Sequence, residues 1–266
     1  MDRLLLTNDD GMDSPALAPF ARALAALAEV DVVVPDRERS WIGKAISRVE
    51  EVSTATFERD GVRITTCSGY PADAVQLGVH TLPAAPPDVV VSGVNLGLNH
   101  GSAFLLSSGT VGAAVEGWIC GLPAVAFSTG VGRARYASWR QEAASELASD
   151  TWQRIAAVCA AVLGDLLATD LPDAADVISV NVPWDVTPTT PRRVTTLART
   201  GYGRLFDAVD ADRFRHRLMG VETMGPLEGT DVGAFADGAV TITPLRMPAA
   251  VNVPSDVRAR LERCRD

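Results

Sequence analysis

Two adjacent carboxylates follow a short apolar run near the amino terminus. Residues 4–11 read LLLTNDDG, so Asp9 and Asp10 come just after three leucines and are followed by Gly11. Side chains alternate between the two faces of an extended strand, so both aspartates can serve one cation only if the chain bends there. Glycine permits such a bend. The run indicates a cation site at the end of a strand; the alternative is a solvated Asp-Asp-Gly turn.

A second loop with polar and charged residues follows the next predicted strand. Residues 35–47 contain the hydroxyl of Ser40 and, four residues later, Lys44, the only lysine in the chain. Lys44 is a candidate phosphate contact because its ammonium group is a compact cation, and the alternative is an exposed side chain without a role. Arginines commonly brace loops, so Arg37 and Arg39 are expected to pair with nearby acids.

A third loop, residues 93–110, is rich in glycines and amides. It contains Asn95 and Asn99 and ends in Ser108, Gly109 and Thr110, directly before a predicted helix. Free backbone N–H groups at a helix start, together with short hydroxyl side chains, favour phosphate binding. The alternative is an ordinary turn followed by a capping serine. His100, next to Asn99, is a modest candidate for proton donation.

Alternating strands and helices over about the first 180 residues predict a doubly wound, mostly parallel α/β sheet of Rossmann-like type. Ser14 is a plausible N-cap for the first helix. Apolar or alternating runs predict strands at residues 4–6, 30–34, 51–57, 62–66, 88–92, 124–128 and 176–181. Helical patterns cover residues 15–28, 72–82 and 110–120, and a long helix is expected within residues 138–167. In such a sheet the three loops meet at the carboxyl ends of the strands, where ligands bind.

The chain changes character after residue 182. Prolines interrupt residues 183–191, a polar segment spans residues 201–224, and a strand is expected at residues 239–243. The sequence therefore predicts a core domain, residues 1–182, that carries the site. Residues 183–266 are expected to form an extension of hairpins, loops and a terminal helix that packs on the core or on another subunit.

Composition narrows the classes of function. The 266 residues are 47% apolar, with 33 acidic against 24 basic residues and a formal net charge of -9. No basic stripe is present that would neutralise a nucleic-acid backbone, so duplex nucleic acid is not an expected partner. No secretory signal and no apolar run of membrane-spanning length is present, and we expect a cytoplasmic protein with no membrane association.

Several motifs in order resemble the SurE survival-protein family of metal-dependent 5'/3'-nucleotidases, and the resemblance spans nearly the whole chain. The matching segments read NDDG at residues 8–11, PDR with RS at residues 35–40, SGVNLGLN at residues 92–99, SGTV at residues 108–111, EG at residues 116–117, NVP at residues 181–183, GTD at residues 229–231 and TITPL at residues 241–245. The resemblance implies a SurE-like fold and the activity of a phosphoric monoester hydrolase.

The resemblance also implies roles for individual residues. It places one divalent ion per subunit on Asp9, Asp10, Ser40 and Asn95, and because all four donors are oxygens, Mg²⁺ or Mn²⁺ is expected. At the phosphate of the substrate the resemblance implies Ser108, Gly109 and Thr110, and Asn8, Lys44 and Asn99 are further candidates for phosphate binding. The extension is expected to make subunit contacts in a homodimer or homotetramer.

The expected reaction is hydrolysis of nucleoside 5'/3'-monophosphates or of a related small phosphate ester. An ion-bound water would attack phosphorus, backbone N–H groups of residues 108–110 would stabilise the phosphoryl oxygens, and Asp9 or Asp10 would accept a proton. Direct attack by one of these aspartates is the alternative to water.

Departures from the family pattern concern the substrate. Trp41 follows the metal serine, where the family usually has a small residue, and residues 101–108 are one residue longer than usual, with Phe104 in an apolar run. Trp41, Phe104 and His100 are therefore candidate specificity residues, and the preferred substrate is expected to differ from an ordinary nucleoside monophosphate. Two other functions stay open: a phosphatase for a non-nucleotide metabolite, and a noncatalytic nucleotide-binding regulator. A transferase that uses Asp9, Asp10 and a metal is not supported by the other motifs.

Overall fold

A mostly parallel β-sheet forms the centre of the molecule. The structure is a computed structural model that describes residues 1–217, 220–247 and 250–262. In these residues nine strands join one sheet in the order β3-β4-β2-β1-β5-β6-β7-β13-β8. The strands are β1 (Arg3–Thr7), β2 (Glu29–Pro35), β3 (Thr54–Arg59), β4 (Val62–Cys67), β5 (Val89–Leu96), β6 (Ala124–Gly130), β7 (Val177–Pro183), β8 (Arg192–Val194) and β13 (Val240–Leu245).

Six neighbouring strands, from β4 to β7, are all parallel. Every residue of β6 and β7 is buried, as are the first six of β5. This is the pattern of a parallel sheet covered on both faces, and it explains the continuous apolar runs of these strands. The predicted α/β fold class is confirmed.

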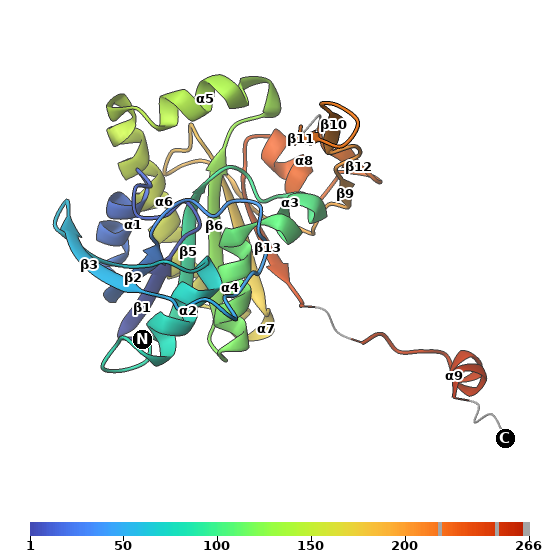
Figure 1. The fold of residues 1–266 in the computed structure, drawn as a ribbon, viewed down its shortest axis with the longest axis horizontal. Coiled ribbons are helices and arrows are strands. Elements are labelled where there is room, and N and C mark those ends of the chain that lie inside the picture. The colour runs from blue at the N-terminus through green and yellow to red at the C-terminus, as the bar shows by residue number, and fades with distance from the viewer. Residues whose placement is uncertain (218–219, 248–249, 263–266) are drawn as a thin grey trace.

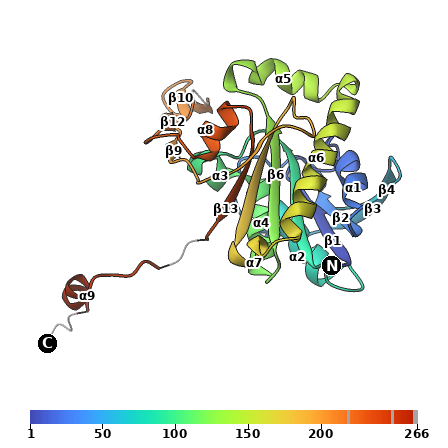
Figure 2. The same ribbon diagram turned by 180° about the vertical axis from the view of Figure 1, so that it is seen from behind.

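Helices cover both faces of the sheet (Figures 1 and 2). The helices are α1 (Leu17–Leu24), α2 (Pro71–His80), α3 (Gly101–Ser107), α4 (Gly109–Ile119), α5 (Tyr136–Ala143), α6 (Ser149–Leu167), α7 (Leu171–Ala174), α8 (Asp231–Ala236) and α9 (Ser255–Leu261), with 3₁₀ turns at Arg133–Arg135 and Glu146–Ala148. The apolar residues of α1 and α6 pack on one face, and those of α2 and α4 pack on the other. In the part of the chain described, no helix combines the length and the apolar character needed to span a membrane.

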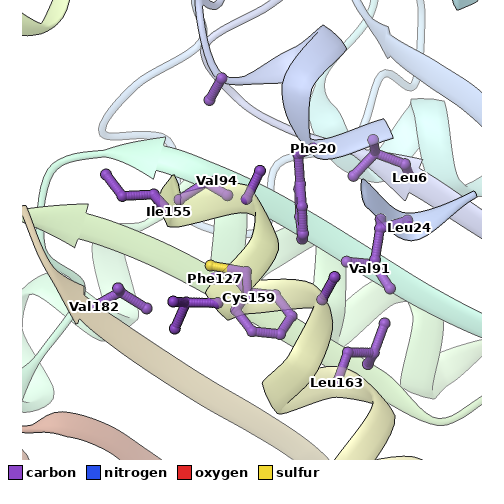
Figure 3. Packing of buried hydrophobic residues seen from close by; sticks show 14 of the residues in the cluster. Leu6, Phe20, Leu24, Val91, Val94, Phe127, Ile155, Cys159, Leu163 and Val182 are labelled. Carbon is purple, nitrogen blue, oxygen red and sulfur yellow. The ribbon is translucent and has the colours of Figure 1, made fainter. Parts of the chain in front are cut away.

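The core under α1 and α6 is built around two phenylalanines (Figure 3). Phe20 of α1 and Phe127 of β6 are fully buried, and their rings meet edge to face with centroids 5.5 Å apart. Ile155 and Leu163 of α6 complete the same cluster. This packing fixes β6, and through it the neighbouring β5, whose carboxyl end carries Asn95.

The predicted hairpin forms one edge of the sheet. β3 pairs antiparallel with β4, and β4 pairs parallel with β2. Asp60 and Gly61, which connect the two strands, both have positive φ, at 51° and 73°. A two-residue turn of this kind matches the twist of the flanking strands.

The carboxyl-terminal segment contributes to the central sheet as well as to an extension. β13 pairs antiparallel with β7, and β8 pairs parallel with β13. Two small antiparallel pairs lie outside the main sheet, formed by β10 (Phe206–Ala208) with β11 (Phe214–His216) and by β9 (Thr200–Gly201) with β12 (Glu222–Thr223). The terminal helix α9 lies apart from the rest of the molecule (Figures 1 and 2). The last residues of the predicted extension, 263–266, lie outside the described residues.

A buried carboxylate joins the extension to the core. Asp231, at the start of α8, is 1% exposed and accepts hydrogen bonds from the N–H groups of Gly101, at 2.8 Å, and Ala198, at 2.9 Å. Hydrogen bonds to a charged group are stronger than those between neutral groups. Asp231 therefore fixes the start of α3, which lies within residues 93–110, the third loop of the sequence analysis.

Two sequence predictions need correction. Ser14 does not cap α1: its carbonyl accepts the N–H of Leu17 in a turn that precedes the helix, and the N-cap position is Ala16, without a side-chain cap. Residues 101–107 form the helix α3 rather than a loop, because apolar Ala103 and Leu105 are buried while Ser102 bonds the extension. Local sequence patterns do not distinguish the turn at Ser14 from a helix cap, and they do not show that Ser102 bonds the extension.

Replacing Phe127 with alanine should lower the free energy of unfolding by about 3–5 kcal/mol, because it removes the fully buried ring that packs on Phe20. Urea unfolding would measure the change. Leu147→Ala is the control: that side chain is 95% exposed, and its loss should change stability by less than about 0.5 kcal/mol. Similar values for the two variants would contradict this account of the core.

Candidate metal and phosphate site

The side chain of Asn8 holds the turn that follows β1. The amide oxygen of Asn8 accepts the N–H of Gly11 at 3.0 Å, and its amide nitrogen donates to the carbonyl of Gly11 at 3.1 Å. Gly11 has φ +81°, and a Cβ there would lie 2.6 Å from the carbonyl carbon of Arg37. The bend thus requires glycine. Both polar ends of Asn8 shape this turn, and its role at a phosphate stays a prediction.

Asp9 and Asp10 enter the site from this turn. Asp9 is buried, and its Oδ1 accepts a hydrogen bond from the hydroxyl of Thr110 at 2.6 Å. Asp10 is half-buried, and its Oδ2 accepts the N–H of Leu96 at 3.0 Å. Through these contacts the two adjacent carboxylates reach the start of α4 and the end of β5.

Loss of water changes the acidity of this pair. Burial raises the pKa of Asp9 above its ordinary value, although the hydrogen bonds from Thr110 act in the opposite direction. Burial also raises the pKa of Asp10, and the neighbouring Asp9 carboxylate raises it further. Where little water is present, each of two neighbouring carboxylates makes it less favourable for the other to be ionised. A cation between them would offset this cost.

The second loop is attached to the turn that carries Asp9. The backbone N–H of Arg39 donates to the carbonyl of Asp9 at 2.7 Å, which ties the loop to the first turn directly before Ser40. Ser40 is exposed, and its hydroxyl donates to Oε1 of Glu38 at 2.6 Å. The hydroxyl oxygen is therefore accessible, and its hydrogen already points to a carboxylate.

Asn95 lies at the carboxyl end of β5, where the strand is irregular. Between the pairs Ser92–Ala126 and Asn95–Ser128, β5 has two residues where β6 has one. Such a bulge redirects the side chains that follow it. The amide nitrogen of Asn95 donates to the carbonyl of Gly97 at 2.7 Å, so the amide oxygen remains for another ligand.

The donor set fits a hard divalent cation. Asp9, Asp10, Ser40 and Asn95 offer only oxygen atoms, and two of them carry charge, which suits Mg²⁺ or Mn²⁺ better than zinc. Within the described ranges, no group of three or more His, Cys, Asp or Glu side chains is arranged for a metal. The candidate site accordingly depends on neutral oxygen donors as well as on the two carboxylates.

The start of α4 approaches Asp9 closely. Ser108 is the N-cap of the helix, and its hydroxyl accepts the N–H of Val111 at 3.1 Å. A Cβ on Gly109 would lie 2.8 Å from Cβ of Asp9 and 3.1 Å from the carbonyl oxygen of Arg39. The first N–H groups of a helix have no partner within it, so they can bind an anion at this position. Ser108, Gly109 and Thr110 are thus grouped with Asp9, as the sequence predicts.

Lys44 binds an acid instead of standing free. Its ammonium nitrogen lies 2.5 Å from Oε2 of Glu116, whose side chain is 2% exposed, and Gln76 donates to the other carboxylate oxygen at 2.5 Å. A buried carboxylate needs such partners. The only lysine of the chain therefore links the second loop to α4, and its predicted contact with phosphate would compete with this ion pair.

Asn99 and His100 are held in other contacts. The amide nitrogen of Asn99 donates to the hydroxyl of Ser128 at 2.8 Å, and its backbone N–H donates to Oδ1 of Asn181, also at 2.8 Å. The ring of His100 packs edge to face on Phe235 of α8, with centroids 5.5 Å apart, and burial lowers its pKa. The structure thus places the two side chains against β6 and α8, and their predicted roles at the substrate stay predictions.

Two charged residues near the site, Arg140 and Glu38, were not predicted from the sequence. Arg140 of α5 donates to the carbonyl of Leu96 at 3.0 Å and lies 4.0 Å from Glu38, and its positive charge lowers the pKa of Asp10. The Glu38 carboxylate raises the pKa of both aspartates. Glu38 stands two residues before Ser40, so the motif at residues 35–40 could have indicated it. Arg140 lies on a helix without a motif, and no sequence signal marks it.

Comparison with known proteins agrees with this geometry. Residues 4–204 match the family model described as survival protein SurE. The chain belongs to the SurE family. It is 37% identical over 269 residues to the 5'-nucleotidase SurE of Methanopyrus kandleri, covering 97% of this chain and 99% of that protein. It is 34% identical over 257 residues to the 5'-nucleotidase SurE of Archaeoglobus fulgidus, covering 96% and 95%.

A solved structure of the same family shares the fold. The SurE protein from Aquifex aeolicus superposes with a TM-score of 0.73 at 31% sequence identity, covering 93% of this chain and 94% of that one. The family resemblance predicted from the motifs is confirmed.

Replacing Gly109 with alanine should lower turnover by about 100-fold, because the new Cβ would push Asp9 or the second loop out of place. Steady-state phosphate release would measure the loss. Gly132→Ala is the matched control, since a Cβ there meets nothing within 4 Å. Full activity in Gly109→Ala would show that the close approach of α4 to Asp9 does not matter.

Proposed function

We propose that the protein is a metal-dependent phosphomonoesterase that hydrolyses nucleoside 5'/3'-monophosphates or a related small phosphate ester. The observation that carries this proposal is the pair Asp9 and Asp10 at the end of β1, with the start of α4 against it. The relatives in Methanopyrus kandleri and Archaeoglobus fulgidus, both named 5'-nucleotidase SurE, support the same class of reaction.

The start of α4 would receive the phosphoryl group. The free N–H groups at residues 109–110 can donate to phosphoryl oxygens, and the positive end of the helix dipole favours negative charge there. One divalent ion per subunit, Mg²⁺ or Mn²⁺, would be held by Asp9, Asp10, Ser40 and Asn95. When bound, it supplies positive charge that offsets the phosphate dianion and lowers the pKa of water.

The aspartate pair would also take part in proton transfer. Water is the nucleophile in this proposal, and Asp9 or Asp10 accepts its proton. A carboxylate within hydrogen-bond reach of the attacking water can act as its general base. Thr110 keeps Asp9 oriented by donating to Oδ1, which leaves Oδ2 for the reaction or for the ion.

Assembly through the extension is part of the same proposal. We propose that residues 183–266 contact a second subunit in a homodimer or homotetramer. Exposed apolar side chains on the β10–β11 hairpin, Val209 at 48% and Phe214 at 63%, support this. Sedimentation or light scattering would give the subunit number.

Phosphate release from a nucleoside monophosphate should require Mg²⁺ or Mn²⁺ and stop when a chelator is added. Asp9→Asn should lower turnover by at least about 100-fold, because it removes charge from the ion site and a proton acceptor. Asp13→Asn is the control, since that carboxylate lies four residues away and its side chain is 84% exposed. Chelator-resistant activity, or full turnover in Asp9→Asn, would rule out the proposed site.

A further inference from the structure

Four aromatic side chains gather beside the second loop. We call Trp41, Phe104, Tyr202 and His216 the Trp41 cluster. The ring centroid of Trp41 lies 6.0 Å from that of Phe104, 5.4 Å from Tyr202 and 5.1 Å from His216. These residues come from the loop after β2, from α3 and from the extension, so the fold brings them together from three distant parts of the chain.

Trp41 has an unusual backbone and an unusual exposure. Its φ is +62°, in the left-handed region that favours glycine. The side chain is 45% exposed, the largest value for any of the five tryptophans, whereas Trp139, Trp152 and Trp184 are at most 5% exposed. An outlier of this kind persists only where surrounding contacts hold it, and such outliers cluster at functional sites. The three neighbouring rings supply those contacts.

The cluster adjoins the phosphate end of the candidate site. Trp41 directly follows Ser40, and two residues later the N–H of Gly43 donates to the carbonyl of Ser107 at 3.0 Å. The hydroxyl of Tyr202 forms hydrogen bonds with Ser107 and with the carbonyl of Ala103. Ser107 precedes the N-cap Ser108. The rings and the proposed phosphate cradle therefore share one corner of the molecule.

Aromatic rings bind flat ring systems by offset or edge-to-face stacking. Base-on-aromatic stacking tolerates different bases, because every base has a π-face. In a phosphate ester held at Ser108 to Thr110, the group next to the phosphate is the leaving group. A ring-lined surface beside that position selects among leaving groups by their shape.

We infer that Trp41, held by its cluster, is a specificity-determining residue that stacks on the flat ring of the leaving group. Trp41 is then the residue that favours phosphate monoesters with a nucleobase or another aromatic ring over aliphatic ones. This inference rests on the proposed phosphomonoesterase function and adds the residue that selects among its substrates.

Two esters that differ only in the base test the inference: adenosine 5'-monophosphate and ribose 5-phosphate. The metal-loaded wild type should have the higher kcat/KM for the nucleotide. Trp41→Gly should lower kcat/KM for the nucleotide about tenfold, mainly through KM, and leave that for ribose 5-phosphate unchanged. Glycine suits φ +62°, so this variant should fold, and its melting temperature would check that.

Further variants separate stacking from a general effect. Phe57→Ala is the matched control, because Phe57 is also 45% exposed but lies on the edge strand β3, outside the cluster. Trp41→Phe keeps a ring and should retain most of the preference for the nucleotide. Phe104→Leu removes a supporting ring and should reduce that preference even if Trp41→Gly folds poorly.

The possible failures are distinguishable. Phosphate release from both esters with no preference in the wild type, or an equal effect of Trp41→Gly on both, would overturn the assignment of Trp41 and leave the phosphomonoesterase function standing. No phosphate release from any ester with Mg²⁺ or Mn²⁺ would overturn both.

Discussion

The burial of two adjacent carboxylates, Asp9 and Asp10, is the constraint on which the rest of the site depends. The two carboxylates lie at the end of β1 with little access to water, and burial raises the pKa of each. The chain holds them there with hydrogen bonds from Thr110 and from the N–H of Leu96. A fold keeps such a cost where another charge offsets it. A divalent ion among oxygen donors is the group that fits.

The sheet explains how the four proposed donors come to the same place. β1, β2 and β5 are parallel neighbours, so the loops that follow them leave the same edge. A backbone hydrogen bond from Arg39 to the carbonyl of Asp9 then holds two of these loops together, and Gly109 of the third lies close to the Asp9 side chain. The lack of a side chain at Gly109 therefore matters as much as the donors do. The strands determine at which edge of the sheet the loops begin, and close packing between the loops determines the final positions of their side chains.

The sequence predicted the features that depend on local pattern or on strand order. Apolar runs predicted the parallel strands, and their order predicted that Asp9 and Ser108 to Thr110 would meet. Side-chain partners were harder to predict, because they depend on tertiary neighbours. Lys44 pairs with Glu116, 72 residues away, and nothing near Lys44 in the chain indicates that.

The same limit applies to the surroundings of the site. Arg140 reaches Leu96 and Glu38 from a helix whose sequence carries no motif. Trp41 stood out as a bulky residue after Ser40, but its partners Tyr202 and His216 lie in a segment that sequence patterns describe only as polar loops and hairpins. Such contacts become visible only when the extension is folded onto the core.

A crystal structure with Mn²⁺ tests the central claim most directly. Anomalous scattering should show one manganese ion per subunit, with oxygen ligands from Asp9, Asp10, Ser40 and Asn95 at roughly 2.1 Å, the distance typical of small hard cations. An anomalous map without a peak among these four side chains, or with its only peak elsewhere, would contradict the account.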